Sequence, residues 1–449
     1  MLDNIFQTNT RESLTYFSAS FVIWFVCLGL LPSIIIYNIK LKRPQWLKET
    51  ARCFLSFLLS LGLVISIGIF YYQSFVTTLR NHHELQKMIT PVNLLYSLGH
   101  YVNDTYLQKP QPYQKLGLDA TQQRPNAITK PQIIMLVIGE TARSQNYQSY
   151  HYPRDTNAFT QALGLLSFQH TTSCGTATAV SLPCLFSTLT RENFSNTVAD
   201  NQDNLLDIIK RVGVNTVWFD NNTGCKGVCK NITTIETNPN ENNLDEVLLD
   251  PIQKTLNNLP SKDTLIVVHL LGSHGPDYYH RYPKAHLHYT PDCERNDIQH
   301  CSRDALINTY DNTIRYSDFM VSEFIRLLKQ KQGQYDTSLI YISDHGESLG
   351  EHGLYLHGTP YALAPIQQTH IPFMAWLPDN VINAQQLNQQ CLKEKALHAH
   401  MSHDNIFHSM LGLLHIETAL YQPKLDIFAN CRDLTPSTSH GLSAGSSDL

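Results

Sequence analysis

Two long stretches near the N-terminus contain no charged residue. The first lies between Glu12 and Lys40, and the second lies between Arg52 and Arg80. Each stretch supplies the roughly 20 apolar residues that a helix needs to cross a bilayer. Because two such stretches follow each other closely, a buried core helix or a cleaved signal peptide is the weaker interpretation. We therefore expect a membrane domain over residues 1–79, with transmembrane helices at about 14–37 and 53–75.

The basic residues around these stretches predict the orientation of the chain. Lys40, Lys42, Arg43 and Lys48 crowd the short connection between the two spans, whereas the N-terminal tail carries only Arg11. Basic residues favour the cytoplasmic side of a membrane. We expect the connection to be cytoplasmic, both termini to lie outside, and everything after about residue 72 to occupy an oxidising space.

The charge content of the chain indicates which kinds of binding partner to expect. Of the 449 residues 16% are charged, which is low and agrees with a chain that faces water only in part. The net charge of -5, without a basic tail, argues against a nucleic-acid partner.

The cysteines agree with an oxidising compartment. Eight of the ten cysteines lie after the two apolar stretches, in the close pairs 174/184, 225/229 and 293/301, with Cys391 and Cys431 left over. Disulfides are the natural interpretation outside the cytoplasm, although spacing alone leaves the connectivity open. Half of a zinc site or a redox motif at 225–229 is less favoured, because no second pair accompanies it and the spacing is not C-x-x-C.

The rest of the chain has an α/β pattern. Apolar, strand-like runs alternate with segments of helical periodicity, which predicts a mostly parallel sheet covered by helices on both faces. We expect strands at 133–138, 214–219, 264–271, 338–342 and 371–376, and helices at 204–211 and 317–328. We also expect a periplasmic connector over 80–130 with an interfacial helix from Pro91, an α/β domain over 131–433, and a disordered tail over 434–449.

Polar residues collect where three of the predicted strands end. Glu140 follows the first run, Asp344, His345 and Glu347 follow the fourth, and His274 follows the third. Ligands of α/β sheets bind beyond the carboxyl ends of the strands. Carboxylate and imidazole groups are the ligands that hold Zn²⁺ when one position stays open for a substrate. A single Asp or His after a strand is often only a turn residue, but three such sites together favour a metal centre.

A nucleophile candidate lies in the segment 173–184, which is rich in hydroxyl groups and small residues. A turn of this kind that leads into a helix can direct backbone N–H groups and an alcohol toward an anion. Contact with Zn²⁺ would lower the pKa of that alcohol. Chemistry alone does not separate Thr176, Thr178 and Ser181. The alternative interpretation is a disulfide-linked helix start with structural hydroxyls.

These motifs resemble those of the phosphoethanolamine transferases of Gram-negative bacteria. The resemblance rests on Gly-Glu-Thr-Ala-Arg, Cys-Gly-Thr-Ala-Thr-Ala, Asp-Asn-Asn followed by Cys-Lys-Gly-Val-Cys, Gly-Ser-His-Gly-Pro, and Ser-Asp-His-Gly-Glu-Ser-Leu-Gly-Glu-His-Gly, in unbroken order over about residues 80–432. The best match is to the lipid A branch, which includes the mobile colistin-resistance enzymes. The resemblance implies an alkaline phosphatase/sulfatase-like fold, a sandwich around a mostly parallel central sheet.

Carried over by position, the resemblance assigns roles to particular residues. It implies one zinc ion, leaving a second one open, and makes Thr178 the nucleophile as well as a ligand. It also implies disulfides 174–184 and 293–301, and in some members 225–229. The implied zinc ligands are Glu140, Thr178, Asp344 and His345; the further catalytic residues are His274, His357 and Lys226; and the substrate-binding residues are Asn222, Thr223 and Glu347.

The implied function is transfer of phosphoethanolamine from phosphatidylethanolamine to a phosphate of lipid A through a covalent threonine intermediate, which confers polymyxin and colistin resistance. The expected location is the bacterial inner membrane, as a multi-pass monomer with the catalytic domain in the periplasm. The family usually has five membrane helices, and the two seen here would correspond to the last two, in a natural short form or a chain whose beginning is missing. The alternatives are a phosphoethanolamine or phosphoglycerol transferase acting on another surface glycan, a sulfatase or phosphodiesterase, and a non-catalytic membrane sensor.

Overall fold

The computed structural model of the chain describes residues 19–39, 46–70, 97–99, 102, 112–237 and 244–432. The chain divides into two compact units. One unit contains residues 1–110 with the short segments 295–300 and 359–364, and the other contains residues 111–294, 301–358 and 365–449.

The N-terminal unit contains two long apolar helical stretches. The first consists of α3 (Ala19–Trp24), the π-helical η1 (Phe25–Leu30) and α4 (Leu31–Asn38), and the second is α5 (Trp46–Phe70). The segments Phe21–Asn38 and Lys48–Ile67 are each long and apolar enough to cross a membrane, and neither is buried inside the protein. Two apolar N-terminal helices are thus confirmed. The predicted ends at 14–18 and 71–75 lie outside the described residues.

The second helix begins earlier than the sequence predicts. α5 starts at Trp46 rather than at residue 53, so its first turns include charged residues. Arg52 donates a hydrogen bond to Glu49 at 2.9 Å, which is the i, i+3 spacing that places two side chains on one helix face. The charged residues therefore extend the helix beyond its apolar segment.

The larger unit is built on a seven-stranded sheet. Its strand order is β3 (Leu166–Ser167), β11 (Phe373–Trp376), β8 (Asp336–Ser343), β2 (Gln132–Gly139), β7 (Thr264–His269), β5 (Asn215–Asp220) and β6 (Thr233–Glu236). The five strands from β8 to β6 are parallel, whereas β11 is antiparallel to both of its neighbours. The mostly parallel sheet is therefore confirmed.

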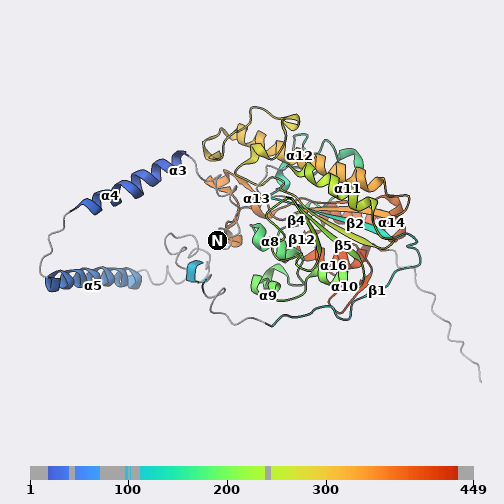
Figure 1. Cartoon of the computed structure of the whole chain (residues 1–449), viewed down its shortest axis with the longest axis horizontal. Helices are drawn as coiled ribbons and strands as arrows, with labels where there is room; N and C mark the ends of the chain where they lie inside the picture. The colour runs from blue at the N-terminus through green and yellow to red at the C-terminus, as the bar shows by residue number, and fades with distance from the viewer. Residues whose placement is uncertain are drawn as a thin grey trace, which may run out of the picture. The chain divides into compact units, whose positions relative to one another are not determined.

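Helices cover the two faces of this sheet. Every residue of β2 is buried, as expected for a central strand with helices on both sides. In Figure 1, α11 (Leu249–Asn257) and α12 (Arg303–Lys329) lie on one face, and α8 (Thr178–Leu185), α10 (Leu205–Arg211) and α16 (Asp404–Leu413) lie on the other. The smaller elements are α9 (Asn196–Asp200), α13 (Ile366–Thr369), α14 (Asp379–Ala384), α15 (Gln389–His398) and the strand pairs β1 (Thr121–Gln122) with β13 (Ile416–Glu417), β4 (His170–Thr172) with β12 (His400–Ser402), and β9 (Ser348–Leu349) with β10 (Tyr355–Leu356).

The predicted elements recur with shifted ends. The five predicted strands correspond to β2, β5, β7, β8 and β11, and the helix predicted at 204–211 is α10, which begins with a capping box between Asn204 and Asp207. The helix predicted at 317–328 is the C-terminal half of the much longer α12. Of the connector predicted over 80–130, residues 97–99 are helical, and most of the segment from Pro91 to residue 111 lies outside the described residues, as does the tail over 434–449.

Disulfides join all eight cysteines of the larger unit. Cys174–Cys184, Cys225–Cys229 and Cys293–Cys301 are the pairs that the resemblance implied. Cys391 and Cys431, whose pairing the sequence left open, also form a disulfide, with Cα atoms 5.5 Å apart. This last bond connects α15 to the end of the described chain. Cys27 and Cys53, both in the apolar helices, are free.

Candidate metal centre and active site

Two carboxylates and one imidazole meet at the carboxyl ends of the central strands. Glu140 directly follows β2, and Asp344 and His345 directly follow β8. The register pairs Gly139 with Ser343, so the residues after these two strands are neighbours. One ligand atom from each of the three residues lies within 4.8 Å of the others, and all three side chains are fully buried. We call Glu140, Asp344 and His345 the carboxylate–histidine cluster.

The hydrogen bonds around this cluster fit a metal ion. Asp344 accepts hydrogen bonds from the N–H groups of Thr141 and His345 with its Oδ1 atom, at 3.1 and 2.7 Å, but its buried Oδ2 atom accepts none. His345 lies with its Nδ1 atom 2.9 Å from the carbonyl oxygen of Gly346. Because a carbonyl can only accept, Nδ1 carries the proton and the lone pair of Nε2 stays available. A ligating histidine fixed in this way, beside an unsatisfied carboxylate oxygen, is typical of metal sites.

The pKa values of the two carboxylates shift in opposite directions. Burial and the nearby Glu140 carboxylate raise the pKa of Asp344. Burial acts in the same direction on Glu140, but the neighbouring histidines, with His345 first, outweigh it and lower the pKa of Glu140. Two like charges in one buried place are costly unless a cation compensates them. This electrostatic conflict is a second feature that fits a bound divalent cation.

Thr178 brings a hydroxyl group to the cluster. Its Oγ1 atom lies 3.1 and 3.2 Å from the two carboxylate oxygens of Glu140 and 3.3 Å from Nε2 of His345. Thr178 is the first residue of α8, so the N-terminus of that helix faces the cluster. By contrast, the Oγ atom of Ser181 accepts a hydrogen bond from the N–H group of Gly175 in its own turn. The structure therefore brings Thr178 to the cluster, whereas the Ser181 hydroxyl is used in a local hydrogen bond.

The loop after β5 carries three of the residues that the resemblance singled out. Asn222 donates a hydrogen bond of 2.7 Å from Nδ2 to the Oε2 atom of Glu140, so its amide contacts a candidate metal ligand. Lys226 donates from Nζ to the Oγ1 atom and the carbonyl oxygen of Thr223, at 2.8 and 3.0 Å. The Cys225–Cys229 disulfide closes this loop.

His274, Glu347 and His357 form a second group next to the cluster, in which Glu347 is fully buried and the two histidines are partly exposed. The ring of His357 lies 5.7 Å from that of His274 and 4.5 Å from that of His345, between ring centres. The Nδ1 atom of His357 lies 3.3 Å from Oε1 of Glu347. Burial lowers the pKa of His274 to about 3. Burial also acts to lower the pKa of His357, but the Glu347 carboxylate outweighs it and raises this pKa to about 9.

A further buried pair supports Glu140, although the sequence interpretation assigned it no role. Asp220 ends β5 and accepts hydrogen bonds from Trp218 Nε1 at 2.8 Å and His269 Nδ1 at 3.0 Å. The Nε2 atom of His269 lies 3.2 Å from the Asn222 amide that contacts Glu140. The available signal was a histidine and an aspartate at the ends of otherwise apolar strands, where neither would stay buried without a partner.

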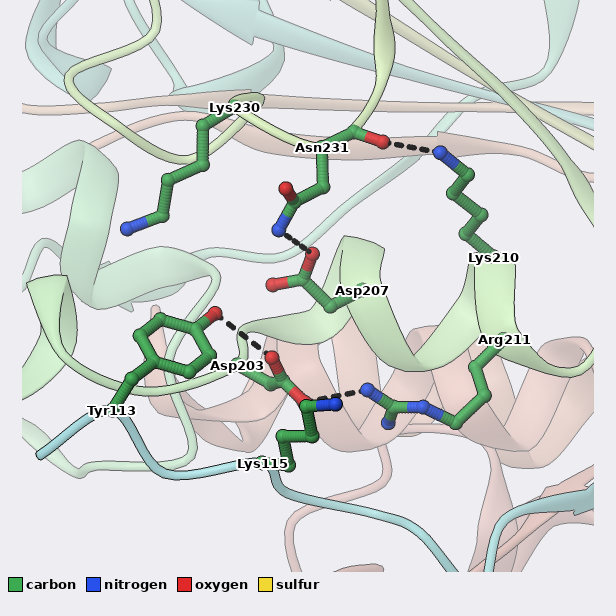
Figure 2. Close-up of a pocket in the computed structure, with 8 residues that line it drawn as sticks. All are labelled: Tyr113, Lys115, Asp203, Asp207, Lys210, Arg211, Lys230 and Asn231. Carbon is green, nitrogen blue, oxygen red and sulfur yellow. Dashed lines mark hydrogen bonds and ion pairs between the residues drawn. The ribbon is translucent and has the colours of Figure 1, made fainter.

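An open hollow of about 760 Å³ lies elsewhere, beside α10. Figure 2 shows Asp203 and Asp207 between basic side chains, and each carboxylate is occupied by protein donors such as Tyr113, Arg211 and Asn231. We call it the α10 hollow; the residues that line it are Tyr113, Lys115, Asp203, Asp207, Lys210, Arg211, Lys230 and Asn231.

The fold and the cluster define a class of protein. A mostly parallel sheet, a carboxylate–histidine cluster at its carboxyl edge and a hydroxyl at a facing helix N-terminus are the parts of a sulfatase-like, metal-dependent enzyme. In agreement, the sequence model of the sulfatase family matches residues 132–416. A second model, described as phosphoethanolamine transferase EptA/EptB, matches residues 1–106.

Similarity to individual proteins shows which family within this class the chain belongs to. The chain is 38% identical to the phosphoethanolamine transferase EptA of Salmonella typhimurium, over 97% of this chain and 81% of the relative. It is 34% identical to the phosphatidylethanolamine transferase Mcr-1 of Escherichia coli, over 84% and 73%. The structure of the integral membrane lipooligosaccharide phosphoethanolamine transferase A from Neisseria meningitidis superposes with a TM-score of 0.89 at 37% identity, covering 96% of this chain and 82% of that one. The chain belongs to the phosphoethanolamine transferase family.

Proposed function

We propose that this protein transfers phosphoethanolamine from phosphatidylethanolamine to a phosphate of lipid A, in the inner membrane and with its larger unit in the periplasm. The observation that carries the proposal is the Thr178 hydroxyl, which lies within 3.3 Å of both Glu140 and His345. The two apolar helices provide access to lipids. The similar proteins act, by their names, on phosphatidylethanolamine and on lipooligosaccharide, whose membrane anchor is lipid A.

The metal in this proposal is zinc, held by Glu140, Thr178, Asp344 and His345. Two carboxylates, an imidazole nitrogen and a hydroxyl oxygen are ligand types that zinc accepts, and a substrate oxygen can complete the coordination. Zinc bound here would make the Thr178 hydroxyl more acidic and offset negative charge on the phosphoryl group. Asn222 orients Glu140 for this role through its 2.7 Å hydrogen bond.

The transfer proceeds by double displacement. The Oγ1 atom of Thr178 attacks the phosphorus of phosphatidylethanolamine, its proton passes to a neighbouring carboxylate, and the bond from phosphorus to the glycerol oxygen breaks. His357, which the Glu347 carboxylate keeps protonated near pH 7, donates a proton to that oxygen, and diacylglycerol leaves. His274 is neutral at this pH and can only hydrogen bond to the departing oxygen. A phosphate oxygen of lipid A then attacks the phosphothreonine, and the Thr178 oxygen leaves and regains a proton. Lys226 offsets charge on the transferring oxygens.

The product explains the proposed resistance. Phosphoethanolamine carries an ammonium group, so its addition lowers the net negative charge of lipid A. Polymyxin and colistin are cationic and bind lipid A partly through its phosphates, so electrostatic attraction to the modified lipid is weaker.

The proposal is tested by mass spectrometry of lipid A from Gram-negative cells that lack other phosphoethanolamine transferases. We expect the protein to add the mass of one phosphoethanolamine group, and Thr178→Ala to abolish this addition while the fold stays intact. Thr172→Ala, at an exposed hydroxyl on β4, is the matched control and should transfer normally. Unmodified lipid A, or full transfer by Thr178→Ala, would refute the proposal. Rapid hydrolysis of water-soluble esters without transfer would favour the hydrolase alternative.

The two histidines are tested separately. His357→Ala and His274→Ala should each slow transfer, and loss of a general acid typically costs about 10²–10⁴-fold in rate. The loss should be larger for His357, which protonates the leaving oxygen. An unchanged rate in either variant would remove that histidine from the reaction.

A further inference from the structure

His403 connects two parts of the active site that lie far apart in the sequence. It is the N-cap residue of α16, and its side chain is fully buried. Its Nδ1 atom accepts a hydrogen bond from the N–H group of Cys174 at 3.1 Å. Its Nε2 atom lies 2.9 Å from the carbonyl oxygen of Ser343, to which it donates. One neutral tautomer, with the proton on Nε2, satisfies both bonds.

The two backbone groups that His403 joins both lead directly to the reacting groups. Cys174 belongs to the segment 173–178, here called the nucleophile turn, which ends in Thr178. Ser343 is the last residue of β8 and is followed directly by Asp344. The ring of His403 is therefore a direct link between the backbone that carries the nucleophile and the strand that carries two of the candidate metal ligands.

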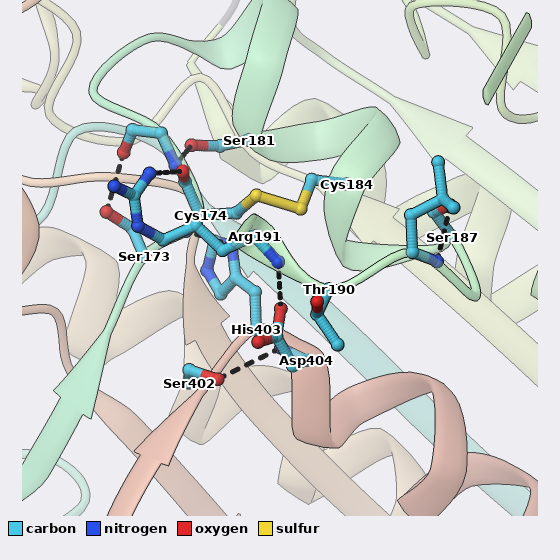
Figure 3. The surroundings of a disulfide bond; sticks show 12 residues. Ser173, Cys174, Ser181, Cys184, Ser187, Thr190, Arg191, Ser402, His403 and Asp404 are labelled. Atoms are coloured by element: carbon cyan, nitrogen blue, oxygen red, sulfur yellow. Dashed lines mark hydrogen bonds between the residues drawn. A yellow bond between two sulfur atoms is a disulfide. The ribbon is translucent and has the colours of Figure 1, made fainter. Parts of the chain in front are cut away.

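Further contacts near His403 also hold the nucleophile turn in place. Arg191 donates from Nη1 to the carbonyl oxygen of Cys174 at 3.1 Å, and its own N–H group donates to Asp404 at 2.9 Å. The Cys174–Cys184 disulfide ties the turn to α8. Figure 3 shows His403, Asp404 and Arg191 gathered around this disulfide. Asp404 follows His403 in the chain, so α16 contacts the turn directly through His403 and indirectly through Asp404 and Arg191.

We propose that His403 is a positioning residue that sets the place of the Thr178 hydroxyl relative to the carboxylate–histidine cluster. The inference rests on the proposed transfer reaction, because it concerns the geometry of that nucleophile. The Thr178 oxygen lies only 3.1–3.3 Å from its neighbours in the cluster, so a small shift of the turn would change every one of these distances. A misplacement of about 1 Å can cost about 100-fold in rate.

The chain offers a matched control on the same helix. His408 lies on α16, is 2% exposed, and its Nδ1 atom accepts a hydrogen bond from the N–H group of Gln422 at 3.1 Å. Burial lowers the pKa of both His403 and His408 to about 4, so both rings are neutral near pH 7. Replacing either ring by Ala leaves one backbone N–H group without its acceptor, but only His403 contacts the nucleophile turn.

The experiment compares the full-length variants His403→Ala and His408→Ala in detergent, with phosphatidylethanolamine as the donor. We expect both to lower the melting temperature, and only His403→Ala to lower kcat by about 100-fold with little change in KM. Hydrogen exchange, followed by mass spectrometry, should become faster in the peptide that covers residues 173–178 for His403→Ala only. His403→Asn, whose side-chain oxygen can still accept from Cys174, should recover part of kcat and part of the protection.

Two results would overturn the inference. One is an equal fall of kcat in the His403→Ala and His408→Ala variants, which would indicate a general loss of stability. The other is unchanged exchange of the nucleophile turn in both His403 variants. Failure of the unmodified protein to transfer phosphoethanolamine would instead refute the proposed function, and the exchange measurement, which needs no substrate, would still decide whether His403 holds the turn.

Discussion

The carboxylate–histidine cluster and the α10 hollow both contain two carboxylates, but they differ in how these carboxylates are satisfied. In the hollow, Asp203 accepts hydrogen bonds from Tyr113 at 2.8 Å, from the N–H group of Leu116 at 3.1 Å, and from Arg211. In the cluster, the buried Oδ2 atom of Asp344 accepts none. A buried acceptor without a donor costs free energy, and contact with a bound cation would offset that cost.

This difference shows why the volume of a hollow is a poor guide to the location of the functional site in this protein. The α10 hollow is open and lined by charges, yet its charges hold protein segments together. Asp203, for example, fixes the chain at Tyr113 and Leu116 to the start of α10. The cluster is compact and fully buried, and the unsatisfied oxygen of Asp344 fits the metal site proposed above. Four substitutions test this contrast: three are given in order of decreasing expected effect on zinc binding, and one is a control.

The largest loss of zinc binding is expected from the substitution Asp344→Asn. The substitution keeps the size of the side chain but removes its negative charge and one of the oxygens that can bind a cation. We expect the purified variant to lose its bound zinc and its transferase activity. Metal content is measured by plasma mass spectrometry on protein of confirmed folding. A variant that keeps one zinc ion per chain would show that the cluster is not the metal site.

Asp207→Asn in the α10 hollow is the control for this substitution. Asp207 accepts hydrogen bonds from Asn231 at 2.8 Å and from the N–H group of Asn204 at 2.9 Å, so it also sits in a charged network. Its replacement should weaken the start of α10 without changing zinc content. Loss of zinc in both variants would remove the contrast between the two regions.

An intermediate loss of zinc affinity is expected from Asp220→Asn, because Asp220 contacts the candidate metal ligand Glu140 only through His269 and Asn222. Asp220 fixes His269 at 3.0 Å, and the other nitrogen of that ring lies 3.2 Å from the Asn222 amide that holds Glu140. Replacement of groups that orient metal ligands typically weakens metal binding by about 10–100-fold. Competition with a zinc chelator measures the affinity. An unchanged affinity would mean that Glu140 is oriented without this pair.

The residues at the strand ends could be predicted because their positions follow from local pattern. Glu140 and Asp344 each follow an apolar run, and parallel strands place such residues at one edge. The pairing of Cys391 with Cys431 could not be predicted, since 40 residues separate them and nothing local relates them. The role of His403 was also hidden, because it depends on a contact with Cys174, 229 positions away.

The sequence pattern did not predict the N-terminal half of α12, and the reason is different. The buried face of this half mixes polar residues, including Asn308, Asp311 and Asn312, with apolar ones, so the apolar periodicity of a helix is weaker there. These side chains bond to neighbouring loops instead; Asn312, for example, accepts from the N–H groups of His288 and Tyr289. Polar burial of this kind is stable only with long-range partners, which the sequence pattern does not show.

The smallest effect on zinc is expected from Asp203→Asn. Asp203 is 4% exposed and accepts three hydrogen bonds, one of them from the charged Arg211. The substitution removes the ion pair and one acceptor, so the free energy of unfolding should fall by about 1–3 kcal/mol. Denaturant titration of the full-length protein measures this loss, and chelator competition should give the zinc affinity of the unmodified protein. Weaker zinc binding here would mean that the α10 hollow and the cluster are coupled, because no hydrogen bond of Asp203 reaches Glu140, Asp344 or His345 directly.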